Sequence, residues 1–235
     1  MRISRKIPRE MMPRDGSAGP TRRIETRHPL RVIRLYPSVL IGCLVPCESA
    51  GEMLHWMTLD ADASVIAARA QPDQIRWNDC GTERRHVPDA EVRFDDGSVV
   101  LREVKAYGDL SPRSKAEVDW RTAVLQSDLP VRGIGYELVD STCTSFRRSV
   151  VAAKDILAVR HRSVPPGLPV LVREAVLLHG AVTVGDLQAM LPMASRADLL
   201  TLALHRHLVI DLGAGPISQQ TSIRLPHANA KELFR

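Results

Sequence analysis

Two acidic residues and a lysine, Asp89, Glu103 and Lys105, are spaced so that a β-hairpin would bring their side chains together. Runs with period-2 alternation flank the sequence Asp-Asp-Gly at 95–97, which predicts a hairpin with a three-residue loop and a left-handed glycine. In that register Asp89 lies across from Glu103, with Cβ atoms roughly 5 Å apart. Lys105 is two residues beyond Glu103 and therefore emerges on the same face. The spacing predicts two carboxylates and an ammonium at one end of the hairpin.

The predicted carboxylate pair suits a divalent cation. At that separation the two carboxylates repel each other, and one ammonium neutralises only one of them. Mg²⁺ binds one or two protein carboxylates and completes its octahedron with water and phosphate oxygens. We therefore expect Asp89 and Glu103 to bind Mg²⁺, for which Mn²⁺ would substitute. A surface hairpin with a cross-strand salt bridge is the alternative interpretation of the same residues.

A third carboxylate, Glu52, lies near the start of a helix that apolar periodicity predicts over about residues 47–61. The spacing of Ser49 and Glu52 is that of a capping box, in which the glutamate bonds back to its own backbone. Alternatively, Glu52 brings a third carboxylate to the metal site from the neighbouring helix. One side chain would not do both, because capping turns the carboxylate towards the helix start.

Composition describes an ordinary globular chain: 235 residues, of which 44% are hydrophobic and 25% charged. The net charge of +5 and the isoelectric point near 9.3 favour an anionic partner such as nucleic acid. No apolar run approaches the roughly 20 residues of a membrane helix, and the N-terminus lacks an apolar signal region, so we expect a cytoplasmic protein without a membrane partner. The four cysteines show no disulfide spacing and are expected to be reduced.

Residues 1–27 form a basic segment that we expect to be disordered when free. Residues 28–162 predict an α/β domain, because the order of its elements fits a mixed central sheet with helices on its faces. Besides the hairpin, the predicted elements are strands within 30–46 and at 65–71, 74–77 and 131–139, a helix at 111–126 that buries Trp120, and a helix capped by Ser145.

Residues 167–226 follow a linker at 161–166, and their sequence predicts mainly short helices rather than strands. Helices are predicted at 168–179, 183–191 and 196–207, and strands at 208–212 and 221–225. Three helices and a two-stranded wing are typical of a winged helix-turn-helix, which often reads DNA. The third helix would present Arg196, Thr201, His205 and Arg206 outwards for DNA or partner contact. Because Asp198 lies among them, contact with a protein is an equal alternative.

Four short motifs occur in one order along the chain: C-E-S-A-G-E at 47–52, A-Q-P at 70–72, H-V-P-D at 86–89 and D-G-S-V-V-L-R-E-V-K at 96–105. In this the chain resembles the TnsA family, the endonuclease subunit of heteromeric transposases, which belongs to the PD-(D/E)xK nucleases. The resemblance covers about residues 30–225. The best-known relative carries Gln at the position of Glu103, whereas Glu is the commoner choice in the wider superfamily.

The resemblance implies a restriction-endonuclease-like mixed sheet followed by a winged helix. It also implies that Asp89 and Glu103 bind Mg²⁺ with the backbone carbonyl of Val104, and that Glu52 completes the site. Lys105 would orient or deprotonate the attacking water and stabilise charge on the phosphate. Gln71 matches the family's Q-P pair and is expected near the site.

The same resemblance implies a function and partners. In the family this subunit cuts the 5′ strands at the ends of a transposon, an integrase-like transposase cuts and joins the 3′ ends, and an ATPase regulator contacts the C-terminal part. We therefore expect double-stranded DNA at transposon ends as the substrate, and association with the nucleoid. The alternatives are a stand-alone restriction-like or repair endonuclease and a non-catalytic DNA-binding regulator.

Overall fold

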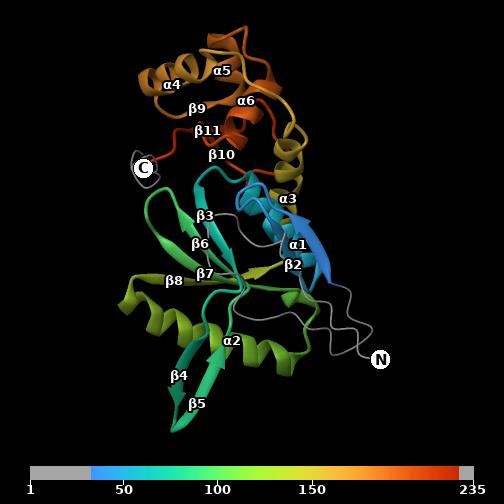
Figure 1. Ribbon diagram of the computed structural model, residues 1–235, viewed down its shortest axis with the longest axis vertical. Coiled ribbons are helices and arrows are strands. Elements are labelled where there is room, and N and C mark those ends of the chain that lie inside the picture. The colour runs from blue at the N-terminus through green and yellow to red at the C-terminus, as the bar shows by residue number, and fades with distance from the viewer. Residues whose placement is uncertain (1–32, 228–235) are drawn as a thin grey trace. The chain divides into compact units, whose positions relative to one another are not determined.

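The computed structural model describes residues 33–227, so the basic segment predicted at 1–27 lies outside the described residues (Figure 1). The described residues form two compact units. The first comprises 33–56, 67–93 and 98–141, and the second comprises 57–66, 94–97 and 142–227. The units do not follow the boundary predicted near 162–167, because helix α3 (Thr144–Leu157) shares the apolar core of the second unit.

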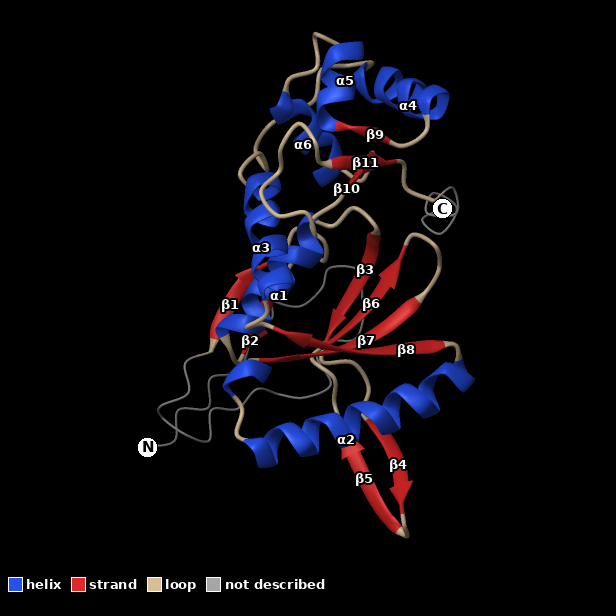
Figure 2. Ribbon diagram, turned by 180° about the vertical axis from the view of Figure 1, so that it is seen from behind, coloured by secondary structure: helices blue, strands red, loops and turns tan. Residues whose placement is uncertain are grey.

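The first unit is built on a four-stranded sheet, whose strands are coloured red in Figure 2. Its strand order is β3 (Val65–Ala70), β6 (Ala90–Phe94), β7 (Val99–Lys105) and β8 (Ile134–Asp140). Strands β6 and β7 are antiparallel, whereas β7 and β8 are parallel. This mixed sheet, with flanking helices, confirms the α/β class predicted from the order of elements.

The helices of this unit are α1 (Ala50–Ala61), α2 (Pro112–Asp128) and two short 3₁₀ helices at Tyr107–Asp109 and Leu129–Arg132. Helix α2 begins as predicted, with Pro112 at its first position and the Ser111 hydroxyl accepting from the Ser114 N–H at 3.2 Å. The prediction that Trp120 is buried was wrong. Its side chain is 39% exposed, because α2 turns Val118 and Leu125 inwards instead.

Two small antiparallel hairpins complete the first unit: β1 (Arg34–Pro37) with β2 (Leu44–Cys47), and β4 (Ile75–Asp79) with β5 (Thr82–His86). Strand β5 was not predicted, because its sequence Thr-Glu-Arg-Arg-His has no apolar alternation and four of its five residues are exposed. Pairing with β4 holds this strand in place. Its last residue, His86, leads directly into the segment before β6.

The second unit contains α3, α4 (Leu168–His179), α5 (Val184–Met190) and α6 (Arg196–Leu204). Its small sheet has the order β10 (Val209–Ile210), β11 (Ser222–Arg224), β9 (Val182–Thr183), and both pairings are antiparallel. One continuous apolar core joins residues from all of these helices. Helices α5 and α6 each begin with a complete capping box, formed by Thr183 with Asp186 and by Ser195 with Asp198.

Two local expectations need correction. Helix α3 is capped by the Cys143 side chain rather than by Ser145. Helix α6 ends at Leu204 rather than at residue 207, because the chain turns through a left-handed residue, Arg206, with φ of 59°. None of the helices in the described range is long and apolar enough to cross a membrane, and all four cysteines are free thiols.

Candidate active site

The β6–β7 hairpin has the register that the sequence predicts. Ala90 pairs with Arg102, so the preceding residue, Asp89, is in line with Glu103. The Asp89 N–H donates to the Arg102 carbonyl at 2.9 Å, which continues the ladder one step beyond the strand. Gly97 ends the loop with φ of 88°, a left-handed conformation that glycine adopts without steric cost. Turn chemistry thus sets which carboxylates face each other.

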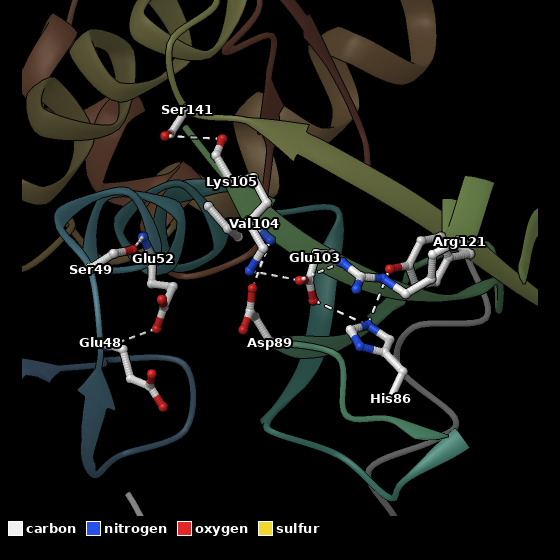
Figure 3. A network of polar contacts seen from close by, with 11 residues as sticks. Glu48, Ser49, Glu52, His86, Asp89, Glu103, Val104, Lys105, Arg121 and Ser141 are labelled. Atoms are coloured by element: carbon white, nitrogen blue, oxygen red, sulfur yellow. Dashed lines mark hydrogen bonds and ion pairs between the residues drawn. The ribbon is translucent and has the colours of Figure 1, made fainter. Parts of the chain in front are cut away.

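Glu103 is surrounded by positively charged or protonatable groups (Figure 3). Lys105 Nζ lies 2.7 Å and Arg121 Nη2 lies 3.4 Å from Glu103 Oε1. On the other side, His86 Nε2 lies 3.1 Å from Oε2. Burial alone would raise the pKa of Glu103, but the approach of His86 and the charge of Lys105 outweigh it and lower the pKa. Glu103 is therefore a carboxylate at all ordinary pH values.

The negative charge of Asp89 is stabilised by fewer neighbouring groups than that of Glu103. Its Oδ2 accepts one hydrogen bond, from the Val104 N–H at 2.8 Å. Desolvation and the nearby charge of Glu103 raise the pKa of Asp89 to about 7, although Lys105 acts in the opposite direction. The pKa values of the two carboxyl groups are thus shifted in opposite directions, and added positive charge beside Asp89 would favour its charged form.

Glu52 takes part in capping α1, although not in the way predicted. The Ser49 hydroxyl accepts from the Glu52 N–H at 3.1 Å, as a capping box requires. The Glu52 carboxylate, however, accepts from the N–H of Glu48 at 2.8 Å rather than from that of Ser49. Burial raises the pKa of Glu52. One oxygen of this side chain is therefore engaged by its own backbone, while its role as a metal ligand stays a prediction.

The side chains predicted for the site in the first unit line one pocket of about 460 Å³, whereas Val104, whose backbone carbonyl was expected to bind the metal, is not among its lining residues. Its lining consists of Glu48, Glu52, Gln71, Gln74, Arg85, His86, Val87, Asp89, Glu103 and Lys105. Sequence reasoning gave His86, which stands in the H-V-P-D motif, no part in the Mg²⁺ or catalytic site. It also missed Arg121, which reaches Glu103 from α2, because no local pattern links that helix to β7.

The donor set of this pocket fits a hard cation. Among the described residues, no three His, Cys, Asp or Glu side chains converge closely enough to hold a metal ion. Two oxygen atoms that line the pocket are nevertheless buried without a hydrogen-bond partner, Glu103 Oε2 and Gln71 Oε1. Glu103 Oε2 does, however, have His86 Nε2 3.1 Å away, whereas Gln71 Oε1 is left without a partner. Carboxylate and amide oxygens are ligands that Mg²⁺ and Mn²⁺ accept.

The residues predicted to face outwards from α6 are differently placed. Thr201 is fully buried, and its hydroxyl donates to the Ala197 carbonyl at 2.7 Å. Arg206 donates to the carbonyls of Asp60 and Leu204, at 3.0 and 2.9 Å. The prediction of outward-facing side chains was therefore wrong for Thr201 and Arg206. The physical reason is that α6 is packed within the core on nearly all sides.

The other two residues of that set lie at the ends of α6. Arg196 is partly exposed, but its guanidinium pairs with Asp155 at 2.8 Å and donates to the Ile217 carbonyl at 3.0 Å. His205, which follows the last helical residue, is exposed. The four residues thus do not form one outward face.

Comparison of the chain with models of known protein families gave no match, and a search of curated proteins also gave none.

Proposed function

We propose that the first unit is a metal-dependent DNA endonuclease with a restriction-endonuclease-like fold of the PD-(D/E)xK type. The observation that carries the proposal is the alignment of Asp89 with Glu103 across β6 and β7, with Lys105 2.7 Å from Glu103 in the same pocket. Two carboxylates and a lysine beside a pocket are the groups that metal-assisted phosphodiester hydrolysis needs.

In this proposal Asp89 and Glu103 hold Mg²⁺ or Mn²⁺, helped by the carbonyl of Val104. The ion supplies positive charge for the phosphate and lowers the pKa of bound water. Burial would lower the pKa of Lys105, but the charges of Glu103 and Asp89 raise it, so this side chain is an ammonium in the free protein. An ammonium suits stabilisation of charge on the phosphate better than proton abstraction.

We further propose that the second unit is a winged helix, with β10 and β11 as its wing, and that it contacts protein rather than DNA. The arrangement of α4, α5 and α6 with an antiparallel sheet supports the first part. Burial of Thr201 and the backbone contacts of Arg206 argue against α6 as a DNA reader. Helix α4 instead exposes apolar side chains, among them Leu178 at 80%.

The ordered motifs support a more specific assignment, a TnsA-like endonuclease subunit of a heteromeric transposase. This subunit would cut the 5′ strands of double-stranded DNA at transposon ends, in the cytoplasm and in association with the nucleoid. Its partners would be an integrase-like transposase and an ATPase regulator. The exposed apolar surface of α4 is compatible with such protein contacts.

Cleavage of an end-labelled DNA duplex in Mg²⁺ and in Mn²⁺ tests the proposal. Wild type, Asp89→Ala and the surface control Asp73→Ala are compared, each with and without an integrase-like transposase encoded beside this gene. We expect cutting only with the transposase, lost in Asp89→Ala and kept in Asp73→Ala. Cutting by the lone protein, lost in Asp89→Ala, would instead indicate a stand-alone nuclease. Intact DNA binding without any cutting would indicate a non-catalytic regulator.

A further inference from the structure

The structure points to Gln71 as the third side-chain ligand of the metal, through its amide oxygen. This inference rests on the proposed metal site of Asp89 and Glu103 and deepens it. The site then has two charged oxygen donors and one neutral one.

The first observation is an unpartnered acceptor. Gln71 is only 7% exposed, and its Oε1 is buried without a hydrogen-bond partner. The side chain lines the same pocket as Asp89, Glu103 and Lys105. A buried carbonyl oxygen that forms no hydrogen bond is unfavourable unless something in the pocket supplies positive charge or a proton.

The second observation is the backbone of Gln71. It has φ of 45°, in the left-handed region that side chains other than glycine seldom adopt, and it precedes Pro72, which restricts it further. Its N–H donates to the Asp89 carbonyl at 3.0 Å, which ties it to a residue of the carboxylate pair. Strained conformations of this kind persist at functional sites, where they aim a side chain at a ligand.

The chemistry of the acceptor limits the ligand. Phosphate oxygens accept hydrogen bonds and carry negative charge, so an amide carbonyl oxygen gains nothing from facing them. A divalent hard cation, in contrast, takes Asn and Gln carbonyl oxygens as ligands together with carboxylates. A cation between Asp89 and Glu103 is therefore a partner that would satisfy Oε1.

The contacts of Glu52 support the same assignment. One of its oxygens accepts from the Glu48 N–H at 2.8 Å, so only the other could bind a metal without breaking a helix-start hydrogen bond. Gln71 Oε1 has no such bond to lose.

Calorimetric titration of the full chain with Mn²⁺, without DNA, tests the inference through affinity rather than activity. Gln71→Met keeps the size of the side chain and removes the acceptor, and we expect it to weaken binding by about tenfold or more, since loss of even an outer-shell partner of a metal ligand typically costs about 10–100-fold. Gln71→Glu should bind at least as tightly as wild type, since it adds a charged oxygen. Gln74→Met is the matched control, because Gln74 lines the same pocket but is exposed, and its affinity should stay within about twofold.

Two further variants separate the possible failures. Gln71→Gly suits the left-handed backbone and should fold even if the methionine variant does not, with the same loss of affinity. Asp89→Asn tests the proposed site itself. Loss of binding in Asp89→Asn with wild-type affinity in Gln71→Met and Gln71→Gly would overturn the inference and leave the proposed function intact. Unchanged binding in Asp89→Asn would overturn the metal site on which both rest.

Discussion

Two acidic side chains, Asp198 in the second unit and Asp89 in the first, are treated in opposite ways by the fold. Asp198 accepts from the hydroxyl and the N–H of Ser195, at 2.6 and 3.1 Å, and the hydroxyl bond is the main reason that its pKa is lowered. Asp89 accepts one hydrogen bond, from the Val104 N–H, and its pKa is raised to about 7. The fold stabilises the charged form of Asp198, whereas it destabilises the charged form of Asp89.

This contrast separates an acid with a structural role from one that we propose to bind a metal ion. The carboxylate of Asp198 completes a capping box and holds the start of α6, so the folded chain itself satisfies it. Asp89 lines a pocket, and its burial beside a second carboxylate, Glu103, makes its charged form unfavourable. Groups kept in unfavourable electrostatic surroundings beside a pocket are typical of functional sites.

The largest effect is expected when the positively charged side chain beside each kind of acid is removed: Lys105 beside Glu103, and Arg162 beside Asp198. Lys105→Met should lower the rate of DNA cleavage by at least about 100-fold, because it removes the ammonium that stabilises charge on the phosphate. Its affinity for Mn²⁺ should not fall, since a competing cation is lost from Glu103. Arg162→Met removes the cation 3.4 Å from Asp198 and is the control. Equal cleavage rates in the two variants would contradict the assignment of Lys105.

The pH dependence of stability sharpens the contrast. Because the pKa of Asp89 in the folded protein lies above the ordinary value of 3.8, its protonated form stabilises the fold, and this stabilisation is lost as the pH rises through about 7. Asn mimics the protonated form, so the stability of Asp89→Asn relative to wild type should increase steadily between pH about 4 and pH about 8, and at pH about 8 the variant should be the more stable by about 1 kcal/mol or more. Scanning calorimetry with EDTA measures the difference. If the stability difference between Asp89→Asn and wild type did not depend on pH, the pKa of Asp89 would not be raised by the fold.

Removal of the Asp198 carboxylate should lower the stability of the protein, whereas Asp89→Asn should raise it. Asp198→Ala takes away the side chain that accepts from Ser195, so we expect a loss of about 1 kcal/mol and a fall in Tm of about 2–4 °C. Asp186→Ala removes the corresponding residue of the α5 capping box and is a matched comparison. A gain of stability in Asp198→Ala would remove the distinction between the two acids.

The smallest effect is expected at Glu52. Glu52→Gln keeps an oxygen that can accept from the Glu48 N–H, so the free energy of unfolding should change by less than about 0.5 kcal/mol. Affinity for Mn²⁺ in calorimetric titration should fall by no more than about threefold, less than in Gln71→Met. A larger loss in Glu52→Gln than in Gln71→Met would make Glu52 the third ligand.

Much of the fold of the first unit could be predicted from local chemistry. The three-residue loop at 95–97 and period-2 alternation were enough for the register that aligns Asp89 with Glu103. The Ser111-Pro112 signal was enough for the start of α2. Prediction failed where packing overrides local pattern, at the polar strand β5 and at Trp120, because both depend on which neighbour each surface meets.

The sequence by itself determined the two carboxylates and the lysine on one face, since turn type and strand period depend on residues close together in the chain. Only the tertiary structure decided what surrounds them. His86 and Arg121 meet Glu103 from other elements, and Thr201 is enclosed by the core. The unpartnered oxygen of Gln71 also became visible only in the fold, because hydrogen-bond satisfaction and burial depend on contacts between segments distant in sequence.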